Sequence, residues 1–180
     1  MNSVLITGAS SGFGEACARK FAAHGQRLVL CARRADRLSA LADELSQITE
    51  VHSVVLDVRD REAVFALPAA LPAAFADVGI LVNNAGLALG LGGADVASVD
   101  DWEAMVDTNI KGVMYLTQAM LPGMVARGGG HVVNIGSVAA SWPYPGGNVY
   151  GGTKAFVQQF SRNLRADLLG KSIRVSNIEP

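Results

Sequence analysis

Short apolar runs return along this chain at a regular interval, and segments with a helical pattern separate them. The runs occupy residues 4–6, 28–31, 54–56, 80–82, 132–135 and 173–178. The first five hardly alternate with polar residues, which is typical of strands covered on both faces in a parallel sheet. Strands that alternate with helices in this way predict a doubly wound α/β fold, a Rossmann-type parallel sheet with helices on both faces.

The helices expected between these strands differ in length. They are predicted at residues 15–24, 35–46, 60–65, 101–127 and 150–169. Pro68 and Pro72 are expected to keep the third helix short. A break near Asn109 is expected to divide the fourth segment into two helices, and Gly170 is expected to cap the last helix.

No linker divides the chain, which predicts a single domain over residues 1–180. Half of the residues are hydrophobic and 17% are charged, as in a compact globular protein. The sixth strand is followed directly by Pro180, whereas a further strand and a substrate lid would normally complete such a fold. We therefore expect a domain that is incomplete at its C-terminus.

The charge balance and the cysteines exclude several classes of function. A formal net charge of −1 favours a small-molecule substrate over nucleic acid. The first residues do not resemble a secretory signal, and no run reaches the roughly 20 apolar residues that span a bilayer. We therefore expect a cytoplasmic protein with no membrane partner. Cys17 and Cys31 fit neither a disulfide framework nor metal-ligand spacing, so no metal is expected.

A glycine-rich turn, Thr7-Gly8-Ala9-Ser10-Ser11-Gly12-Phe13-Gly14, joins the first apolar run to the first helix. The first glycine permits the tight turn, the second lets the backbone approach a pyrophosphate, and the third allows close packing of helix on strand. The N-terminus of the helix then presents free N–H groups to the anion. The residues expected to contact a dinucleotide are Gly8, Ser10, Ser11, Gly12, Phe13 and Gly14.

Two arginines follow the second strand and indicate which dinucleotide binds. An NAD site usually has Asp or Glu at this point, which accepts a hydrogen bond from the ribose 2′-hydroxyl. This chain has Arg33 and Arg34, and guanidinium groups bind a 2′-phosphate. Asp36 fits the first turn of the following helix instead. The alternative is a solvated basic turn; we favour NADP(H) over NAD(H), with Ser10 helping to hold the phosphate.

Polar residues also follow the third and fourth strands. Asp57 is placed to accept from the adenine amino group, with Val58 beside it; the alternative is a helix-capping or surface residue. In Asn83-Asn84-Ala85-Gly86, we expect Asn83, Ala85 and Gly86 to line the cofactor ribose. Ligands of this fold bind outside the carboxyl ends of the strands, where all these residues fall.

Four further residues have the chemistry of proton transfer. Tyr150 and Lys154 share one face of a helix because they are four residues apart. A tyrosine ordinarily has a pKa of about 10, and a neighbouring ammonium favours its ionised form. Ser137, after the fifth strand, could polarise a substrate carbonyl, and Asn109 could hold a water that links the lysine to solvent. Alone, each could be a surface pair, a loop residue or a helix cap. Residues 142–147 are interpreted as an active-site loop.

These motifs, in this order, resemble those of the short-chain dehydrogenases/reductases along the whole chain. The resemblance implies that Ser137, Tyr150 and Lys154 are catalytic and that Asn109 completes a proton relay. It also implies that Pro180, where the Pro-Gly usual in the family is cut, contacts the cofactor. Family members commonly form homotetramers through two long helices, here near residues 110–127 and 150–169.

A narrower resemblance, to the NADP-dependent 3-hydroxy acid dehydrogenases, is visible in residues 83–90, 119–125 and 141–150. It implies an oxidoreductase that moves a hydride between NADP(H) and a small 3-hydroxy acid such as serine, L-allo-threonine or 3-hydroxypropanoate. Two alternatives remain open. One is a reductase of another carbonyl compound, such as a 3-oxoacyl group or a ketone, and the other is a catalytically incompetent NADP-binding fragment.

Overall fold

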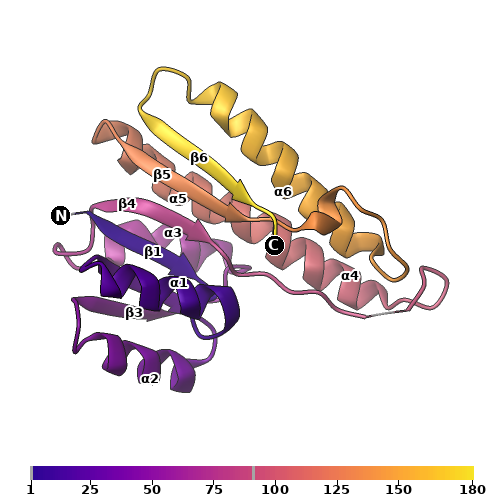
Figure 1. The fold of residues 1–180 in the computed structure, drawn as a ribbon, viewed down its shortest axis with the longest axis horizontal. Coiled ribbons are helices and arrows are strands. Elements are labelled where there is room, and N and C mark those ends of the chain that lie inside the picture. The colour runs from indigo at the N-terminus through magenta and orange to yellow at the C-terminus, as the bar shows by residue number, and fades with distance from the viewer. Residues whose placement is uncertain (1, 91) are drawn as a thin grey trace.

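The computed structural model describes residues 2–90 and 92–180 and contains one six-stranded parallel sheet (Figure 1). Its order is β3-β2-β1-β4-β5-β6, which confirms the predicted Rossmann-type sheet. The strand order reverses between β1 and β4, and ligands of doubly wound sheets bind beside this point. The strands are β1 (Ser3–Thr7), β2 (Arg27–Ala32), β3 (Val51–Val55), β4 (Val78–Asn83), β5 (Gly130–Ile135) and β6 (Ile173–Ile178).

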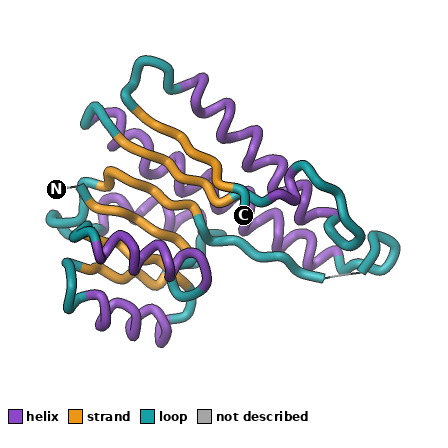
Figure 2. The backbone as a smooth tube through the Cα atoms, in the orientation of Figure 1, coloured by secondary structure: helices purple, strands orange, loops and turns teal. Residues whose placement is uncertain are grey.

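Helices cover both faces of the sheet (Figure 2). One face packs on α1 and α2, and the other packs on α3, α5 and α6. The helices are α1 (Gly12–Ala23), α2 (Ala35–Leu45), α3 (Arg61–Ala70), α4 (Val99–Val106), α5 (Gly112–Ala126) and α6 (Asn148–Asp167), with a π-helix η1 (Asp107–Lys111) and a short 3-10 helix η2 (Val138–Ala140).

The two helical layers explain why the strands read as unbroken apolar runs. Val4 and Ile6 of β1 belong to the core against α1 and α2, whereas Leu5 between them belongs to the core against α3, α5 and α6. All three side chains are fully buried. A strand with both faces buried needs apolar residues at every position, because successive side chains point to opposite faces.

Two predicted helix boundaries were wrong, and a third prediction is confirmed in part. The fourth segment is divided near Asn109 into α4 and α5 as expected, but the π-helix η1 joins them without a break in the chain of helices. α3 continues through Pro68 to Ala70, since Leu67 is buried in the core and still accepts from the Leu71 N–H at 3.1 Å. α6 ends at Asp167 with Leu168 as its C-cap, so Gly170 lies in the following turn, at a φ of +78°.

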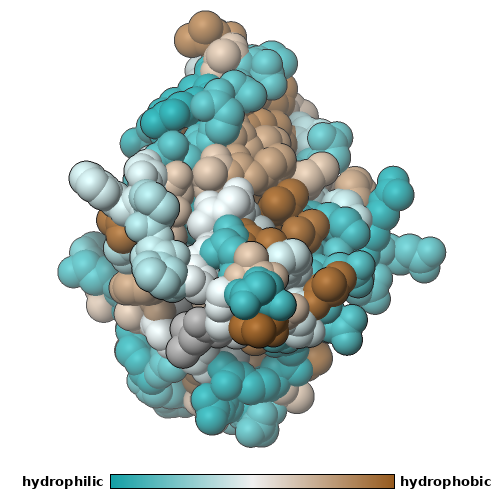
Figure 3. All heavy atoms as spheres, turned by 90° about the vertical axis from the view of Figure 1, so that its right-hand side faces the viewer, coloured by the Kyte–Doolittle hydropathy of each residue, from teal (hydrophilic) through white to brown (hydrophobic). Residues whose placement is uncertain are grey.

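The end of the molecule that faces the viewer in Figure 3 mixes polar and apolar side chains. The start of α4 and the loops beside it contain the exposed apolar residues Val96, Val99 and Trp142. The arrows of Figure 1 point toward the same end. Exposed apolar side chains therefore lie beyond the carboxyl ends of the strands.

Within the part of the chain that the structure describes, no helix combines the length and the apolar character needed to cross a membrane. The described residues also contain no group of three or more His, Cys, Asp or Glu side chains arranged to hold a metal ion.

A chain of buried hydrogen bonds connects β4, β5, α5 and α6. Asn83 donates to Thr117 Oγ1 at 3.1 Å and to Asn134 Oδ1 at 2.8 Å, and Asn134 donates to Ser161 Oγ at 2.8 Å. All four side chains are buried. The network therefore fixes both helices against the sheet where β4 and β5 end.

We expect Asn134→Ala to lower the free energy of unfolding by about 2 to 4 kcal/mol, because it removes two buried hydrogen bonds, one from Asn83 and one to Ser161. Urea denaturation would measure the change. Asn163→Ala is the matched control. This exposed α6 residue accepts a hydrogen bond from Gln159 at 3.0 Å, and its replacement should change the free energy of unfolding by less than about 0.5 kcal/mol. Equal effects of the two substitutions would contradict the role of the network.

Candidate active site

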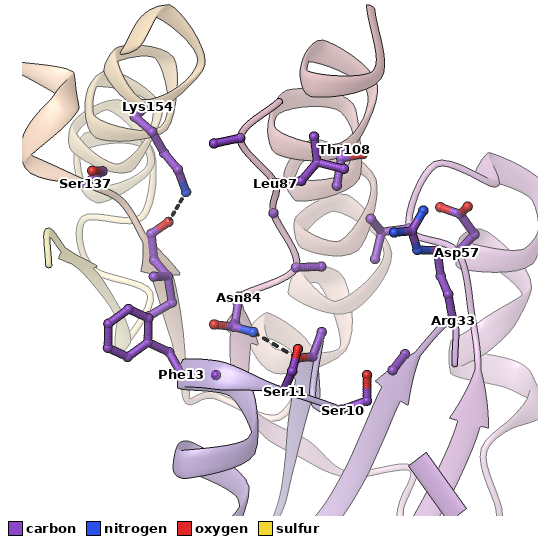
Figure 4. A pocket seen from close by; sticks show the side chains of 18 of the residues that line it. Ser10, Ser11, Phe13, Arg33, Asp57, Asn84, Leu87, Thr108, Ser137 and Lys154 are labelled. Atoms are coloured by element: carbon purple, nitrogen blue, oxygen red, sulfur yellow. Dashed lines mark hydrogen bonds between the residues drawn. The ribbon is translucent and has the colours of Figure 1, made fainter. Parts of the chain in front are cut away.

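A cavity of about 590 Å³ lies over the carboxyl ends of the strands (Figure 4). It is lined by segments far apart in the sequence: the turn before α1, the residues after β2 and β3, the loop after β4, the end of β5, and α6. The lining among residues 2–90 and 92–180 comprises Gly8, Ser10, Ser11, Gly12, Phe13, Ala32, Arg33, Arg34, Leu56, Asp57, Val58, Asn84, Ala85, Gly86, Leu87, Ala88, Thr108, Ile135, Gly136, Ser137, Tyr150, Lys154 and Pro180.

The glycine-rich turn forms the floor of this cavity and is tied to the loop after β4. Thr7 Oγ1 accepts from the N–H groups of Asn84 and Ala85 at 3.1 and 3.0 Å, and the Asn84 amide donates to Thr7 O at 2.9 Å. Gly8 has a φ of +64°, which favours glycine. A Cβ at Gly14 would lie 2.4 Å from Gly8 O. Gly14 is thus outside the lining and shapes the turn by close packing, as the motif predicts.

Cationic side chains gather at one end of the cavity. Arg34 Nη2 donates to Ser11 Oγ at 2.8 Å and to Ser10 Oγ at 3.2 Å, so the guanidinium lies across the turn. Arg33 lines the same region, beside Asp57 (Figure 4). Two guanidinium groups and two serine hydroxyls are the donors that a phosphate requires, and this end of the cavity therefore fits a 2′-phosphate. Asp36 lies outside the lining, in α2.

Asp57 is held by a residue that the sequence analysis did not single out. Arg59 donates to it from Nη2 at 2.6 Å and from Nε at 3.0 Å. The side-chain hydrogen bond from Arg59 is the main cause that holds the pKa of the Asp57 carboxyl below its usual value. Asp57 is therefore an ionised acceptor at neutral pH, as contact with an adenine amino group requires.

The residues with acid–base chemistry lie at the other end. Tyr150, Lys154 and Ser137 all line the cavity, and Figure 4 places Ser137 and Lys154 opposite Arg33 and Asp57. Lys154 Nζ donates to Ile135 O at 2.8 Å and lies 5.8 Å from the centroid of the Tyr150 ring. Burial lowers the pKa of Lys154 to about 8, so the ammonium is mostly protonated at neutral pH.

This lowered pKa predicts a pH-dependent stability. Below pH 8 Lys154 is charged in both the native and the unfolded state. The native state then bears the full free-energy cost of burying an ammonium group. Between pH 8 and 10.5 the native state loses this proton before the unfolded state does, so native stability rises, by up to about 3 kcal/mol.

Urea denaturation of the wild type and of Lys154→Met at pH 7.5 and at pH 10 tests this. We expect any stability advantage of the methionine variant to shrink as the pH rises. A difference between the two proteins that is the same at both pH values would contradict the expectation.

Two predicted site residues, Asn109 and Asn83, lie behind the cavity wall rather than in it. Asn109 is 1% exposed; its Oδ1 accepts from Leu87 N at 2.9 Å, and its Nδ2 donates to Leu87 O at 2.8 Å and to Thr153 Oγ1 at 3.1 Å. The side-chain amide of Asn109 therefore holds the loop after β4, and its part in a proton relay with Lys154 stays a prediction. Asn83 points into the buried network, because alternation along β4 directs it toward α5 and α6.

Several lining residues were missed, and one predicted loop is not part of the cavity. Asn84 lines it where Asn83 was expected, and Leu87, Ala88 and Thr108 also line it. Residues 142–147 connect η2 to α6 outside the lining, which corrects their interpretation as an active-site loop. The sequence could have indicated Leu87 and Ala88, because they continue the loop after β4 whose first residues were predicted to contact the cofactor.

The sheet order, the glycine-rich turn and the placement of Tyr150 and Lys154 define a dinucleotide-binding α/β protein with an acid–base pair at one end of its cavity. Comparison with known proteins agrees. The model of the family described as short chain dehydrogenase matches residues 2–180. This chain belongs to the short-chain dehydrogenase family.

Individual relatives are similar over almost the whole chain. The NADP-dependent 3-hydroxy acid dehydrogenase of Salmonella typhi is 58% identical over 177 residues, which are 98% of this chain and 71% of that protein. Sulfoacetaldehyde reductase 2 of Chromohalobacter salexigens is 55% identical over 178 residues, again 98% and 71%. A solved structure, the closed form of serine dehydrogenase complexed with NADP+, matches with a TM-score of 0.94 and 56% identity, over 98% of this chain and 71% of that one.

Proposed function

We propose that this protein is an NADP(H)-dependent oxidoreductase that acts on the CH–OH group of small 3-hydroxy acids such as serine, L-allo-threonine or 3-hydroxypropanoate. The observation that carries the proposal is that one cavity has two arginines and two serines at one end and Tyr150, Lys154 and Ser137 at the other. The 58% identity to an NADP-dependent 3-hydroxy acid dehydrogenase supports the substrate class. Residues 1–180 are proposed to form a single dinucleotide-binding and catalytic domain.

The cofactor contacts follow from the lining. Arg33, Arg34 and Ser10 are proposed to bind the 2′-phosphate, and Asp57 with Val58 the adenine. Gly8, Ser11, Gly12 and Phe13 lie along the floor, where the first turn of α1 offers free N–H groups to the pyrophosphate. Ala85 and Gly86 are proposed to contact the ribose, and Pro180, which also lines the cavity, is proposed to contact the cofactor.

The proposed chemistry assigns one task to each reacting side chain. When bound, NADP(H) supplies a nicotinamide carbon that accepts or donates the hydride. In oxidation Tyr150 takes the proton of the substrate hydroxyl, and in reduction it returns a proton to the carbonyl oxygen. Ser137 donates a hydrogen bond to that oxygen as its charge changes. Lys154, whose Nζ lies 5.8 Å from the centroid of the Tyr150 ring, is proposed to bind the nicotinamide ribose.

A substrate panel with the full-length protein tests the proposal. NADPH formation at 340 nm should be seen with serine, L-allo-threonine or 3-hydroxypropanoate, and it should be much weaker with NAD+ in place of NADP+. Activity confined to 3-oxoacyl thioesters or ketones would favour another carbonyl substrate. NADPH binding without turnover of any compound would favour a catalytically incompetent module.

A second substrate class has a specific observation in its favour, the 55% identity to sulfoacetaldehyde reductase 2. A sulfonate and a carboxylate are both small anions carried near the reacting carbon, so the same cavity could serve either. Including isethionate, the alcohol that corresponds to sulfoacetaldehyde, in the panel separates the two. A higher kcat/KM for isethionate than for every 3-hydroxy acid would assign the sulfonate as substrate.

We also propose a cytoplasmic homotetramer that associates through α5 and α6. Met114 of α5 is exposed, and in α6 Phe156 stacks on Phe160 with ring centroids 5.6 Å apart and remains partly exposed. Apolar side chains on exposed helices favour association. Sedimentation velocity of the full-length protein tests this, and a monomer at micromolar concentration would refute it.

A further inference from the structure

A line of hydrogen bonds joins the wall of the cavity to the first turn of α6. Asn109 holds the backbone of Leu87 through both of its amide groups and donates from Nδ2 to Thr153 Oγ1 at 3.1 Å. Thr153 Oγ1 in turn donates to the backbone oxygen of Tyr150 at 2.7 Å. Asn109 and Thr153 are each only 1% exposed, so water does not compete for these bonds.

The hydroxyl of Thr153 makes two hydrogen bonds. Hydroxyls of helical threonines commonly donate to a carbonyl of the preceding turn, as Thr153 does to Tyr150. Here it also accepts a bond from a different segment, η1. Thr153 therefore connects α6 to the loop that forms the cavity wall, which no bond within α6 could do.

The first turn of α6 needs such a connection because it is intrinsically weak. Gly147 is its N-cap and has no side chain to accept a capping hydrogen bond, so Asn148 Oδ1, which accepts from Val149 N at 2.7 Å, satisfies one N–H of this turn. Gly151 and Gly152 follow Tyr150 directly, and each glycine costs a helix about 0.5 to 1 kcal/mol relative to alanine. The position of the Tyr150 phenol thus depends on contacts outside the helix.

The same bonds set the distance between the cavity wall and Lys154. A Cβ at Gly86 would lie 3.2 Å from Asn109 Oδ1 and 3.6 Å from Lys154 Nζ. Gly86 of the cavity wall is therefore close to both Asn109 and Lys154. A shift of the first turn of α6 would change the positions of the phenol and of the ammonium relative to a ligand in the cavity.

We propose that Thr153 is a positioning residue: its hydroxyl fixes the first turn of α6 against the cavity wall and so places the Tyr150 phenol for proton transfer. This inference rests on the proposed function, in which Tyr150 exchanges the proton. Thr153 itself does not line the cavity and touches no reacting atom.

The test compares Thr153→Val, which keeps the shape and removes the hydroxyl, with Thr153→Ser, which keeps the hydroxyl. In the full-length protein we expect the valine variant to lower kcat about tenfold, as small misplacements of reacting groups do. NADPH affinity should change less than about twofold, because the cofactor contacts are elsewhere, and the serine variant should restore kcat. The kcat is expressed per bound NADPH, so that unfolded protein does not count.

A second readout does not depend on turnover. With tyrosine labelled at ¹³Cζ, the Tyr150 signal, assigned by its loss in Tyr150→Phe, should shift in Thr153→Val and return in Thr153→Ser. A valine variant with wild-type kcat and an unshifted signal would overturn the proposal, as would a loss of kcat that serine does not restore. If the wild type binds NADPH and turns over no substrate, the proposed function fails, while the ¹³C shift still decides whether Thr153 positions the phenol.

Discussion

Tyr150→Phe is expected to lower kcat by about a thousandfold while leaving NADPH affinity within about threefold of the wild type. The substitution removes one oxygen atom, the only atom of the ring that exchanges a proton. The ring remains to fill its place beside Lys154, whose Nζ lies 5.8 Å from the ring centroid. Steady-state assays at 340 nm give kcat, and titration of NADPH fluorescence gives the affinity.

Tyr144→Phe is the matched control for this experiment. Tyr144 is exposed, lies in the segment between η2 and α6, and is outside the cavity lining. Its hydroxyl should therefore be dispensable, and the variant should keep the wild-type kcat. Turnover by Tyr150→Phe at a rate similar to that of the control would remove the phenol from the mechanism.

Replacing Arg33 and Arg34 together with alanine is expected to reduce the preference for NADPH over NADH by about a hundredfold or more. Hydrogen bonds to charged groups contribute about 1.5 to 3 kcal/mol each, and every 1.4 kcal/mol corresponds to a tenfold change in affinity. NADH lacks the 2′-phosphate, so its dissociation constant should change little. Fluorescence titration of each reduced cofactor measures both constants.

The control substitution here is Arg37→Ala. Arg37 is exposed in α2, three residues beyond Arg34, and does not line the cavity. Arg37→Ala removes one positive charge, as does each of the substitutions at Arg33 and Arg34. The control therefore separates direct binding of the 2′-phosphate from a general electrostatic attraction of the cofactor. If the double variant weakens NADPH and NADH equally, the arginines do not recognise the 2′-phosphate.

The fold could be predicted because its main determinants are local. Each strand appears as an apolar run, and the parallel arrangement follows from the lack of alternation in runs such as residues 4–6 and 28–31. The glycine-rich turn and the residues after β2 and β3 are likewise fixed by their place after a strand. All the lining residues predicted at these points are present in the cavity except Gly14, which acts through packing.

The predictions at Asn83 and Asn109 failed to anticipate the structure for two reasons. A side chain's direction changes from one residue to the next along a strand, and a side chain's hydrogen bonds can depend on a residue distant in the sequence. Asn83 and Asn84 are neighbours, but β4 ends between them, so the first joins the buried network and the second turns to the glycine-rich turn. Asn109 was selected for a water that links Lys154 to solvent, and the sequence did not indicate that its side-chain amide bonds the backbone of Leu87 on both sides. No local pattern reports such a partner 22 residues away.

Thr153 and Arg59 are residues of the site that the sequence analysis did not identify. Arg59 belongs to no motif with known chemistry, and Thr153 lies between Tyr150 and Lys154 without a role of its own in their chemistry. Each acquires its importance only through the residue it contacts, Asp57 for Arg59 and Asn109 for Thr153. Their contacts arise from the packing of η1 on α6 and from the turn after β3. Sequence reasoning that proceeds from catalytic residue types does not reach them.

The most direct test follows the hydride itself. Full-length protein is incubated with NADP+ and 3-hydroxypropanoate that carries deuterium at C3, and the reduced cofactor is examined by NMR. Transfer between the substrate and a nicotinamide held beside Tyr150 predicts one deuterium at C4 of each NADPH formed, with none lost to water. Deuterium found in the solvent, or NADPH formed without it, would contradict direct hydride transfer in this cavity.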